Sequence, residues 1–320
     1  GNKNLKWERT LSANLGLDLT MFKGRWDFSA DVYVKNTDNL LLDITKAPSL
    51  GITTSRENVG EVENHGFEFQ TRVIPIKNKD WEWSLSLNYA YNKNKIKKIS
   101  NALREQNEKN QAKGGVTPLP IYEEGQSLTA LKVVSSAGID PITGNEVFIK
   151  RDGSLTFVYD PNDKVVYGDT TPFGMGSIGS YLTYKQFSMG MSMRYSFGGA
   201  VYNQTLASKV EGADPRYNAD ERVFSSRWKE VGQQAKYKRI SDSSVPMQTS
   251  RFVETNNYIT LSSLSLAYEV PLTFIKRYGL KRLHLEMLAN DLFYLSSVKR
   301  ERGLSYPYER SVEFSVRLGF

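Results

Sequence analysis

The stretch Ser311–Phe320 reads S-V-E-F-S-V-R-L-G-F and alternates between apolar and polar or small residues. Its even positions hold only apolar residues: Val312, Phe314, Val316, Leu318 and Phe320. Successive side chains on a β-strand point to opposite faces of the sheet, so this stretch predicts a strand with one apolar and one polar face. A soluble sheet edge could show the same pattern once. Its repetition along the chain is therefore what separates the fold classes.

The same alternation returns in eight further stretches, which gives about nine predicted strands. These stretches are 7–22, 25–35, 66–73, 81–92, 177–184, 187–197, 258–270 and 283–290. The alternation in 258–270 changes phase at Ser262-Ser263, which predicts a β-bulge at that point.

The links between these strands alternate between short and long. Short links follow Phe22, Ile76, Tyr184 and Val270, and long links follow Lys35, Asn92, Phe197 and Phe293. The longest link, 93–175, is rich in turn-forming residues, and within it 101–112 is compatible with a polar helix that has no apolar face to dock it. A second short helix is predicted around 221–229. Short turns on one side and long loops on the other are typical of outer-membrane barrels.

Aromatic residues mark both ends of the apolar face in two of the strands. The stretches from Trp81 to Tyr91 and from Phe187 to Phe197 both begin and end on aromatic rings. At roughly 3.3 Å per residue and a tilt near 40°, such a stretch rises about 25 Å, the height of the apolar band of a membrane barrel. A soluble sandwich alternates too, but it explains neither this nor the link lengths. The sequence therefore predicts an all-β fold, a transmembrane antiparallel β-barrel.

Composition agrees with this class and excludes others. The 320 residues include no Cys, so no disulfide or thiolate metal site is possible. A mean hydropathy of −0.47 excludes a membrane-spanning helix but not a barrel. No signal peptide opens the chain, so residue 1 is expected to be an internal start. The net charge of +7 is spread over turns and loops, which favours solvated surface over a nucleic-acid-binding stripe.

In a barrel, the apolar face would meet lipid and the polar face would line the lumen. The predicted lumen-lining residues carry both signs of charge: Asp18, Asp31, Glu68, Arg72, Arg194, His284, Glu286, Glu313 and Arg317. They could guide a substrate, or they could pair across neighbouring strands or with a plug. An odd number of strands that begins on the long-loop side and ends on the short-turn side cannot close alone. The chain is therefore expected to be the second part of a larger barrel.

Several segments resemble SusC/RagA-like TonB-dependent outer-membrane transporters. They are Asn2–Glu8 (NKNLKWE), Gly16–Asp18 (GLD), Asn58–Gly66 (NVGEVENHG), Tyr91–Ile96 (YNKNKI), Gly138–Asn145 (GIDPITGN), Gly168–Pro172 (GDTTP), Arg227-Trp228, Tyr258–Pro271 and Asn290–Phe293 (NDLF). They follow one another in the family's order over the whole chain. Phe320 also resembles the terminal assembly signal of outer-membrane barrels, whereas the polar stretch 101–113 departs from the family pattern.

The resemblance implies a barrel of about 22 strands in the outer membrane, plugged by an N-terminal domain. Residues 1–320 would be its C-terminal part, with the plug and the N-terminal domains outside this chain. The resemblance further implies a SusD-like surface lipoprotein as partner, the TonB–ExbB–ExbD complex acting through the missing N-terminal part, and contact with outer-membrane lipid. The implied function is active import of oligomeric nutrients, either glycans or oligopeptides.

An enzyme is one competing interpretation. The two histidines, His65 and His284, have no Ser or Asp partner at a recognisable motif spacing. The acidic run around Asp152 and Asp160 lacks the spacing of an EF-hand calcium loop and is explained by turn chemistry. No catalytic residue, metal site or cofactor is therefore predicted.

Aromatic residues in the long loops are the candidate ligand contacts. Tyr202, Trp228, Tyr306 and Tyr308 could stack on sugar rings or peptide side chains, or they could pack the loops onto a lid protein. A passive porin and a surface-binding or adhesin barrel are the alternative functions. A plug domain upstream would exclude both of them.

Overall fold

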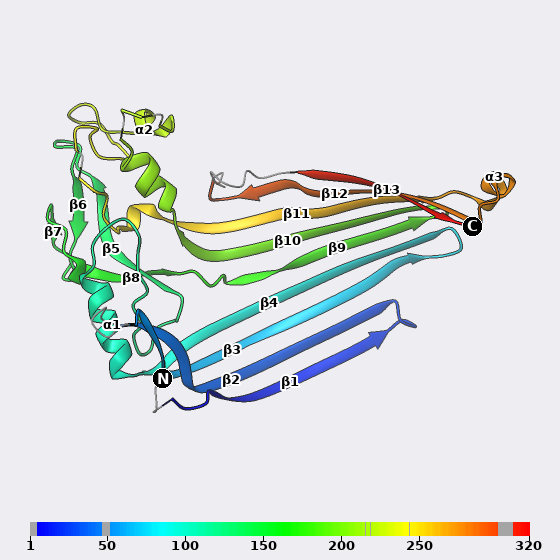
Figure 1. The fold of residues 1–320 in the computed structure, drawn as a ribbon, viewed down its shortest axis with the longest axis horizontal. Helices are drawn as coiled ribbons and strands as arrows, with labels where there is room; N and C mark the ends of the chain where they lie inside the picture. The colour runs from blue at the N-terminus through cyan, green and yellow to red at the C-terminus, as the bar shows by residue number, and fades with distance from the viewer. Residues whose placement is uncertain (1–4, 47–51, 215, 218, 243, 300–309) are drawn as a thin grey trace.

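The computed structural model describes residues 5–46, 52–214, 216–217, 219–242, 244–299 and 310–320. Its main element is one antiparallel sheet of nine strands that lie side by side (Figure 1). In sheet order the strands are β1 (Arg9–Met21), β2 (Trp26–Thr45), β3 (Thr54–Lys77), β4 (Trp81–Ile99), β9 (Gly174–Tyr184), β10 (Phe187–Tyr202), β11 (Val253–Glu269), β12 (Arg282–Ser296) and β13 (Ser311–Gly319). The predicted all-β class and the nine strands are confirmed.

A smaller sheet and most of the helices lie at one end of the large sheet (Figure 1). The small sheet has four strands in the order β7 (Leu155–Thr156), β6 (Glu146–Ile149), β5 (Ala130–Ile139) and β8 (Lys164–Asp169). The helical segments at this end are α1 (Asn101–Ala112), η2 (Pro161–Asp163), η3 (Leu206–Glu211), α2 (Arg222–Ser225) and η4 (Ser250–Phe252). At the opposite end, α3 (Leu272–Ile275) and η5 (Lys276–Tyr278) join β11 to β12.

Tight turns connect the strands at that opposite end, which we call the short-turn end. Between β1 and β2, Phe22, Lys23 and Gly24 all have positive φ, which reverses the chain sharply. Between β3 and β4, the side-chain oxygen of Asn78 accepts hydrogen bonds from the backbone N–H groups of Asp80 and Trp81, at 3.0 and 2.9 Å. The tight turns therefore lie together at one end, as predicted, although the β11–β12 link at that end, 270–281, is longer than the β2–β3 link at the other end, 46–53.

The first of the predicted long links is shorter than the sequence predicted. β2 and β3 stay paired from Thr37 opposite Val62 to Thr45 opposite Thr54, so the link is 46–53 rather than the predicted 36–60. The register shifts between Thr37 and Leu40, where Asn39 has φ 55°. This irregularity breaks the alternation of apolar and polar residues, and that hid the outer halves of both strands in the sequence.

The link predicted over 93–175 is also more ordered than expected. Its first residues, 93–99, complete β4, and residues 101–112 form α1. The strands of the small sheet follow. The strands of that sheet are short, and β5 buries the consecutive residues Val133 and Val134, so no period of two is visible. The predicted helix at 221–229 is only the four residues of α2, because Arg227 instead bridges to Tyr237. The predicted bulge is confirmed, since the register shifts between Leu261 and Ser263.

Register places the apolar residues of neighbouring strands on one face. Leu15 lies opposite Val32, Val32 opposite Phe67, and Phe67 opposite Tyr91, so one apolar row crosses four strands. These residues are not covered: Leu15, for example, is 78% exposed. Among the described helices, none has both the length and the apolar character needed to cross a membrane.

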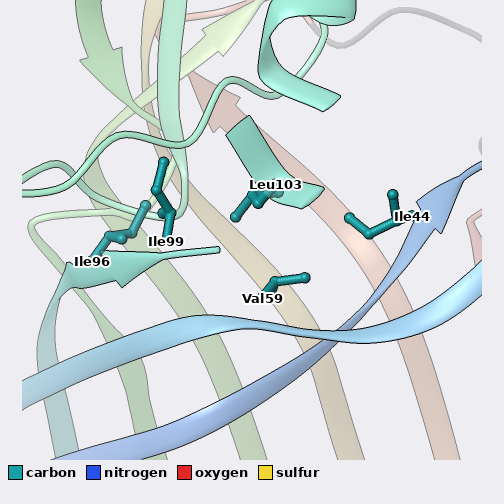
Figure 2. Close-up of a cluster of buried hydrophobic side chains, with 5 residues drawn as sticks. All are labelled: Ile44, Val59, Ile96, Ile99 and Leu103. Atoms are coloured by element: carbon teal, nitrogen blue, oxygen red, sulfur yellow. The ribbon is translucent and has the colours of Figure 1, made fainter. Parts of the chain in front are cut away.

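The docking of α1 corrects the expectation that it has no apolar contact. Its single buried residue is Leu103, which packs with Ile44, Val59, Ile96 and Ile99 from the outer ends of β2, β3 and β4 (Figure 2). Ser100 caps the start of the helix by accepting the N–H of Leu103 at 3.3 Å. At the other end, the Lys164 ammonium donates to carbonyls of Asn110, Gln111 and Lys113 at 3.2–3.4 Å. The helix is thus fixed at both ends.

Candidate functional site

The polar face of the large sheet carries the predicted lumen-lining residues. Pairing runs from Asp18 through Ser29, Gln70, Asn88 and Ser177 to Arg194, which places the two ends of this row on one face. Asp31 lies opposite Glu68, and both line a shallow hollow of about 270 Å³ together with Asn88. Gly16 leaves room for Asp31, because a Cβ at Gly16 would come within 2.6 Å of its carboxylate.

Most of these charges form no ion pair among the described residues. Within the part of the chain that the structure describes, no ion pair involves Asp18, Asp31, Glu68, Arg72, Arg194 or Glu313, and all six side chains are exposed. Arg72 lies opposite Asp27 and Ser86, and Glu313 lies opposite Leu288. This face can therefore offer both signs of charge to whatever lies against it.

The charges near the short-turn end pair across three strands instead. Glu269 contacts Arg282 at 2.8 Å and the Nδ1 atom of His284 at 2.9 Å. Glu286 contacts Arg317 at 3.0 Å and lies 3.9 Å from Nε2 of the same histidine. His284 is thus held between two carboxylates, an arrangement that fixes the ring rather than one that activates a nucleophile.

The long loops at the other end are joined by a buried ion cluster that the sequence did not reveal. Arg251 donates two hydrogen bonds to Glu146 at 2.7 Å, and to Glu211 it donates one of 2.7 Å and one of 2.8 Å. Only 9% of the Arg251 side chain is exposed, and 3% and 1% of the two glutamates. Burial alone would lower the pKa of Arg251, but the two carboxylates outweigh burial and raise it. The cluster links β6, η3 and η4.

Arg227 is a second organising residue of the loops and is 3% exposed. Its guanidinium donates to the carbonyls of Val223, Val210 and Glu211 at 2.7, 2.8 and 2.6 Å. A further bond of 3.2 Å reaches the carbonyl of Lys238. Burial lowers the pKa of Arg227, although nearby carboxylates oppose the shift. The sequence showed an Arg-Trp pair here, but nothing in an irregular stretch distinguishes a buried arginine from an exposed one.

The predicted loop aromatics contact other parts of the loops. The Trp228 indole donates to the carbonyl of Pro141 at 2.9 Å, and its ring covers Gly144, where a Cβ would come within 2.6 Å of the ring. Tyr202 packs edge-on against Phe252 with ring centroids 5.9 Å apart. Contact of either ring with a ligand stays a prediction. Tyr306 and Tyr308 lie outside the described residues.

Phe320 follows the end of β13 and is 79% exposed, and its role in assembly stays a prediction. Within the ranges that the structure describes, no three His, Asp or Glu side chains converge as metal ligands would. The polar turns around Asp140 and Asp152 satisfy their carboxylates internally. For Asp140, hydrogen bonds from Thr143 hold the pKa below its usual value.

Comparison with known sequences gives one family. The family model described as "TonB dependent receptor-like, beta-barrel" matches residues 1–286. The TonB-dependent receptor P3 of Formosa agariphila is 30% identical over 310 residues, a match that covers 91% of this chain and 30% of the relative. The TonB-dependent receptor SusC of Bacteroides thetaiotaomicron is 31% identical over 218 residues, which are 65% of this chain and 21% of SusC. The chain therefore spans about a third or less of the length of these relatives.

Solved structures share the fold. The RagAB peptide importer in its open-open state superposes with a TM-score of 0.80 at 21% identity, over 100% of this chain and 36% of that one. The structure of the RagAB peptide transporter gives a TM-score of 0.77 at 22% identity, over 93% and 33% of the two chains. At this level of identity the likeness concerns the fold.

Proposed function

The chain belongs to the TonB-dependent receptor-like β-barrel family, and on that premise we propose that it is part of a transporter that imports oligomeric nutrients, glycans or oligopeptides, across the outer membrane. The family consists of outer-membrane β-barrel transporters and receptors rather than enzymes. The predicted resemblance to SusC/RagA-like transporters and the outer-membrane location are confirmed.

The two outer strands of the large sheet support the assignment of this chain to a larger barrel. β1 and β13 end the sheet order, so one edge of each has no strand beside it among the described residues. An open edge in the hydrocarbon region leaves N–H and C=O groups without partners, which costs several kcal/mol for each group. Further strands must therefore pair with β1 and β13. We assign residues 1–320 to the C-terminal part of a barrel of about 22 strands, whose other strands and plug lie outside this chain.

A barrel of that size needs a plug, because its own side chains cannot fill it. The exposed charges on the polar face, such as Asp31, Glu68 and Arg194, are suited to contact a plug domain or a passing substrate. A plug makes passage depend on energy. The proposed energy source is the TonB–ExbB–ExbD complex, acting through the part of the protein that precedes this chain.

The long loops support a second element of the proposal, a lid partner. The Arg251 cluster and the contact of Trp228 with Gly144 join loops that are far apart in the sequence into one ordered surface. Such a surface could receive a SusD-like surface lipoprotein that closes over a captured oligomer. Glycans and oligopeptides are both compatible with a polar face that carries both signs of charge.

Deletion of TonB, in parallel with deletion of the intact transporter, tests the proposal. Growth on candidate glycans and peptides would be measured for both strains. We expect the same substrates to be lost in both, and a lipoprotein to copurify with the intact transporter. Uptake through this protein that continues without TonB would replace active transport with a passive pore. Binding of the substrate at the surface without any uptake would support the adhesin alternative.

A further inference from the structure

The α3–η5 link leaves apolar side chains exposed at the short-turn end. Ile275 anchors the link and is 4% exposed, whereas Leu272, Phe274 and Tyr278 are 53%, 66% and 65% exposed. The neighbouring turns at this end, 77–80 and 185–186, contain polar residues only. Three large apolar side chains on such a short link indicate contact with a medium other than water.

The link and the neighbouring turn carry four cations that form no ion pair among the described residues. Lys185, Lys276, Arg277 and Lys281 are all exposed, and none forms an ion pair within the described part of the chain. Arg282, by contrast, is neutralised by Glu269. Two of the four cations lie over aromatic rings, with Lys185 at 5.4 Å from the ring centroid of Tyr184 and Arg277 at 4.7 Å from that of Tyr278. These are stabilising cation–π distances, and they keep the charges at the border of the apolar surface.

An apolar groove begins where these cations end. It has a volume of about 470 Å³ and lies on the apolar face of β9 to β13. Its lining includes Tyr184, Phe187, Leu266, Tyr268, Leu285 and Val316. Tyr184 directly precedes Lys185, and Tyr268 comes shortly before the α3–η5 link. The groove therefore runs from the positively charged end of the sheet toward the middle of its apolar face.

We infer that this end of the barrel binds an anionic phospholipid of the adjacent membrane leaflet. The phosphate and the anionic headgroup would lie among Lys185, Lys276, Arg277 and Lys281, and one acyl chain would occupy the groove. Clusters of basic residues next to a membrane surface attract anionic lipids, with roughly a fivefold gain in binding for each cation. The apolar side chains of the link would enter the interface beside the lipid. This inference needs only the outer-membrane location and is independent of what the barrel transports.

Native mass spectrometry of the intact transporter in detergent tests the inference. The protein would be mixed with equal amounts of dioleoyl-phosphatidylglycerol and dioleoyl-phosphatidylcholine, and the bound fraction of each would be measured. We expect phosphatidylglycerol to be favoured at least about tenfold, and the preference to disappear as salt is raised. The variant Lys185→Gln/Lys276→Gln/Arg277→Gln should lose most of the preference. The control Lys109→Gln/Lys229→Gln removes two exposed lysines from the long-loop end and should keep it.

A separate measurement tests whether the acyl chain occupies the groove. Leu285→Trp places a bulky side chain of a type common on membrane faces into the groove, and it should reduce retention of both dioleoyl lipids. Dihexanoyl-phosphatidylglycerol, which has the same headgroup, should bind more weakly than the dioleoyl form to the unmodified protein. Equal retention of the two headgroups by the unmodified transporter, at low salt, would overturn the inference without any variant. Loss of the preference in the control variant to the same extent as in the triple variant would also overturn it.

Discussion

The position of a residue along a strand decides which medium its side chain meets, because one step moves the side chain to the other face. Met191 lies opposite Leu264, Leu264 opposite Ala289, and Ala289 opposite Val312, which places Met191 in an apolar row in the middle of the sheet. Its neighbour Ser192 lies opposite Gly179 and Ser263 on the polar face.

We expect Met191→Lys to destabilise the barrel by about 2–4 kcal/mol, because the ammonium would be placed in lipid near the midplane. Val316→Lys, nearer the short-turn end, should cost less. Ser192→Lys and Ser315→Lys should be tolerated, since they add charge to the polar face. Unfolding of the intact transporter in bilayers by denaturant would measure all four. Should the serine variants prove the less stable pair, the assignment of the two faces would be reversed.

Arg251 pairs with two buried carboxylates in the long loops. Arg251→Met would leave Glu146 and Glu211 buried without their partner, and breaking a buried ion pair in this way costs about 3–5 kcal/mol. The loss should appear as faster proteolysis of the long loops. The matched control is Arg216→Met, since Arg216 pairs with Asp214 but its side chain is 82% exposed, and such surface pairs contribute little to stability. Equal protease sensitivity of the two variants would contradict a structural role for the cluster.

Among the elements, α1 depends most on a single residue. Leu103→Ala removes its only buried side chain and should cost about 2–5 kcal/mol, whereas Ser100→Ala removes the cap and should cost about 1 kcal/mol. Hydrogen exchange of residues 101–112 would measure both effects, with exposed Lys109→Ala as the control. Exchange in β9 to β13 should not change. If Leu103→Ala left the helix protected, the capping bonds of Lys164 would have to hold α1 by themselves.

The elements show what an alternating sequence can and cannot predict. The alternation located the nine strands, because each has one face in lipid and one in a polar lumen. It failed beyond Lys35, where the irregularity at Asn39 shifts the phase, and at β5, where both faces are buried. For α1 the sequence was compatible with a polar helix but did not reveal its docking, since one leucine among polar residues gives no periodic signal.

At the scale of the whole molecule, the candidate site was predicted less well than the fold. The polar face followed from the alternation. The loop cluster did not, because Glu146 and Arg251 are 105 positions apart and Glu211 and Arg251 are 40 apart. No local pattern connects residues at such separations. Glu211 and Arg251 meet because the pairing of β10 with β11 brings both ends of the loop 203–252 to the same place. Glu146 joins them because β5, which pairs with β6, bridges to Thr249 just before η4.

That same pairing fixes which ends of the strands share a side of the membrane. If short turns face the periplasm, then Lys79 lies inside the cell envelope and Asn162, in η2, lies outside. Because residues 1–320 include no cysteine, Lys79→Cys and Asn162→Cys each introduce the only thiol of this part of the protein, and the transporter without either substitution is the control. On intact cells a membrane-impermeant maleimide should label position 162 strongly and position 79 only after the outer membrane is permeabilised. The side chain of Asn78, which holds the turn, is left unchanged. Labelling of position 79 but not of 162 on intact cells would place the Arg251 cluster, and with it the proposed lid surface, on the periplasmic side.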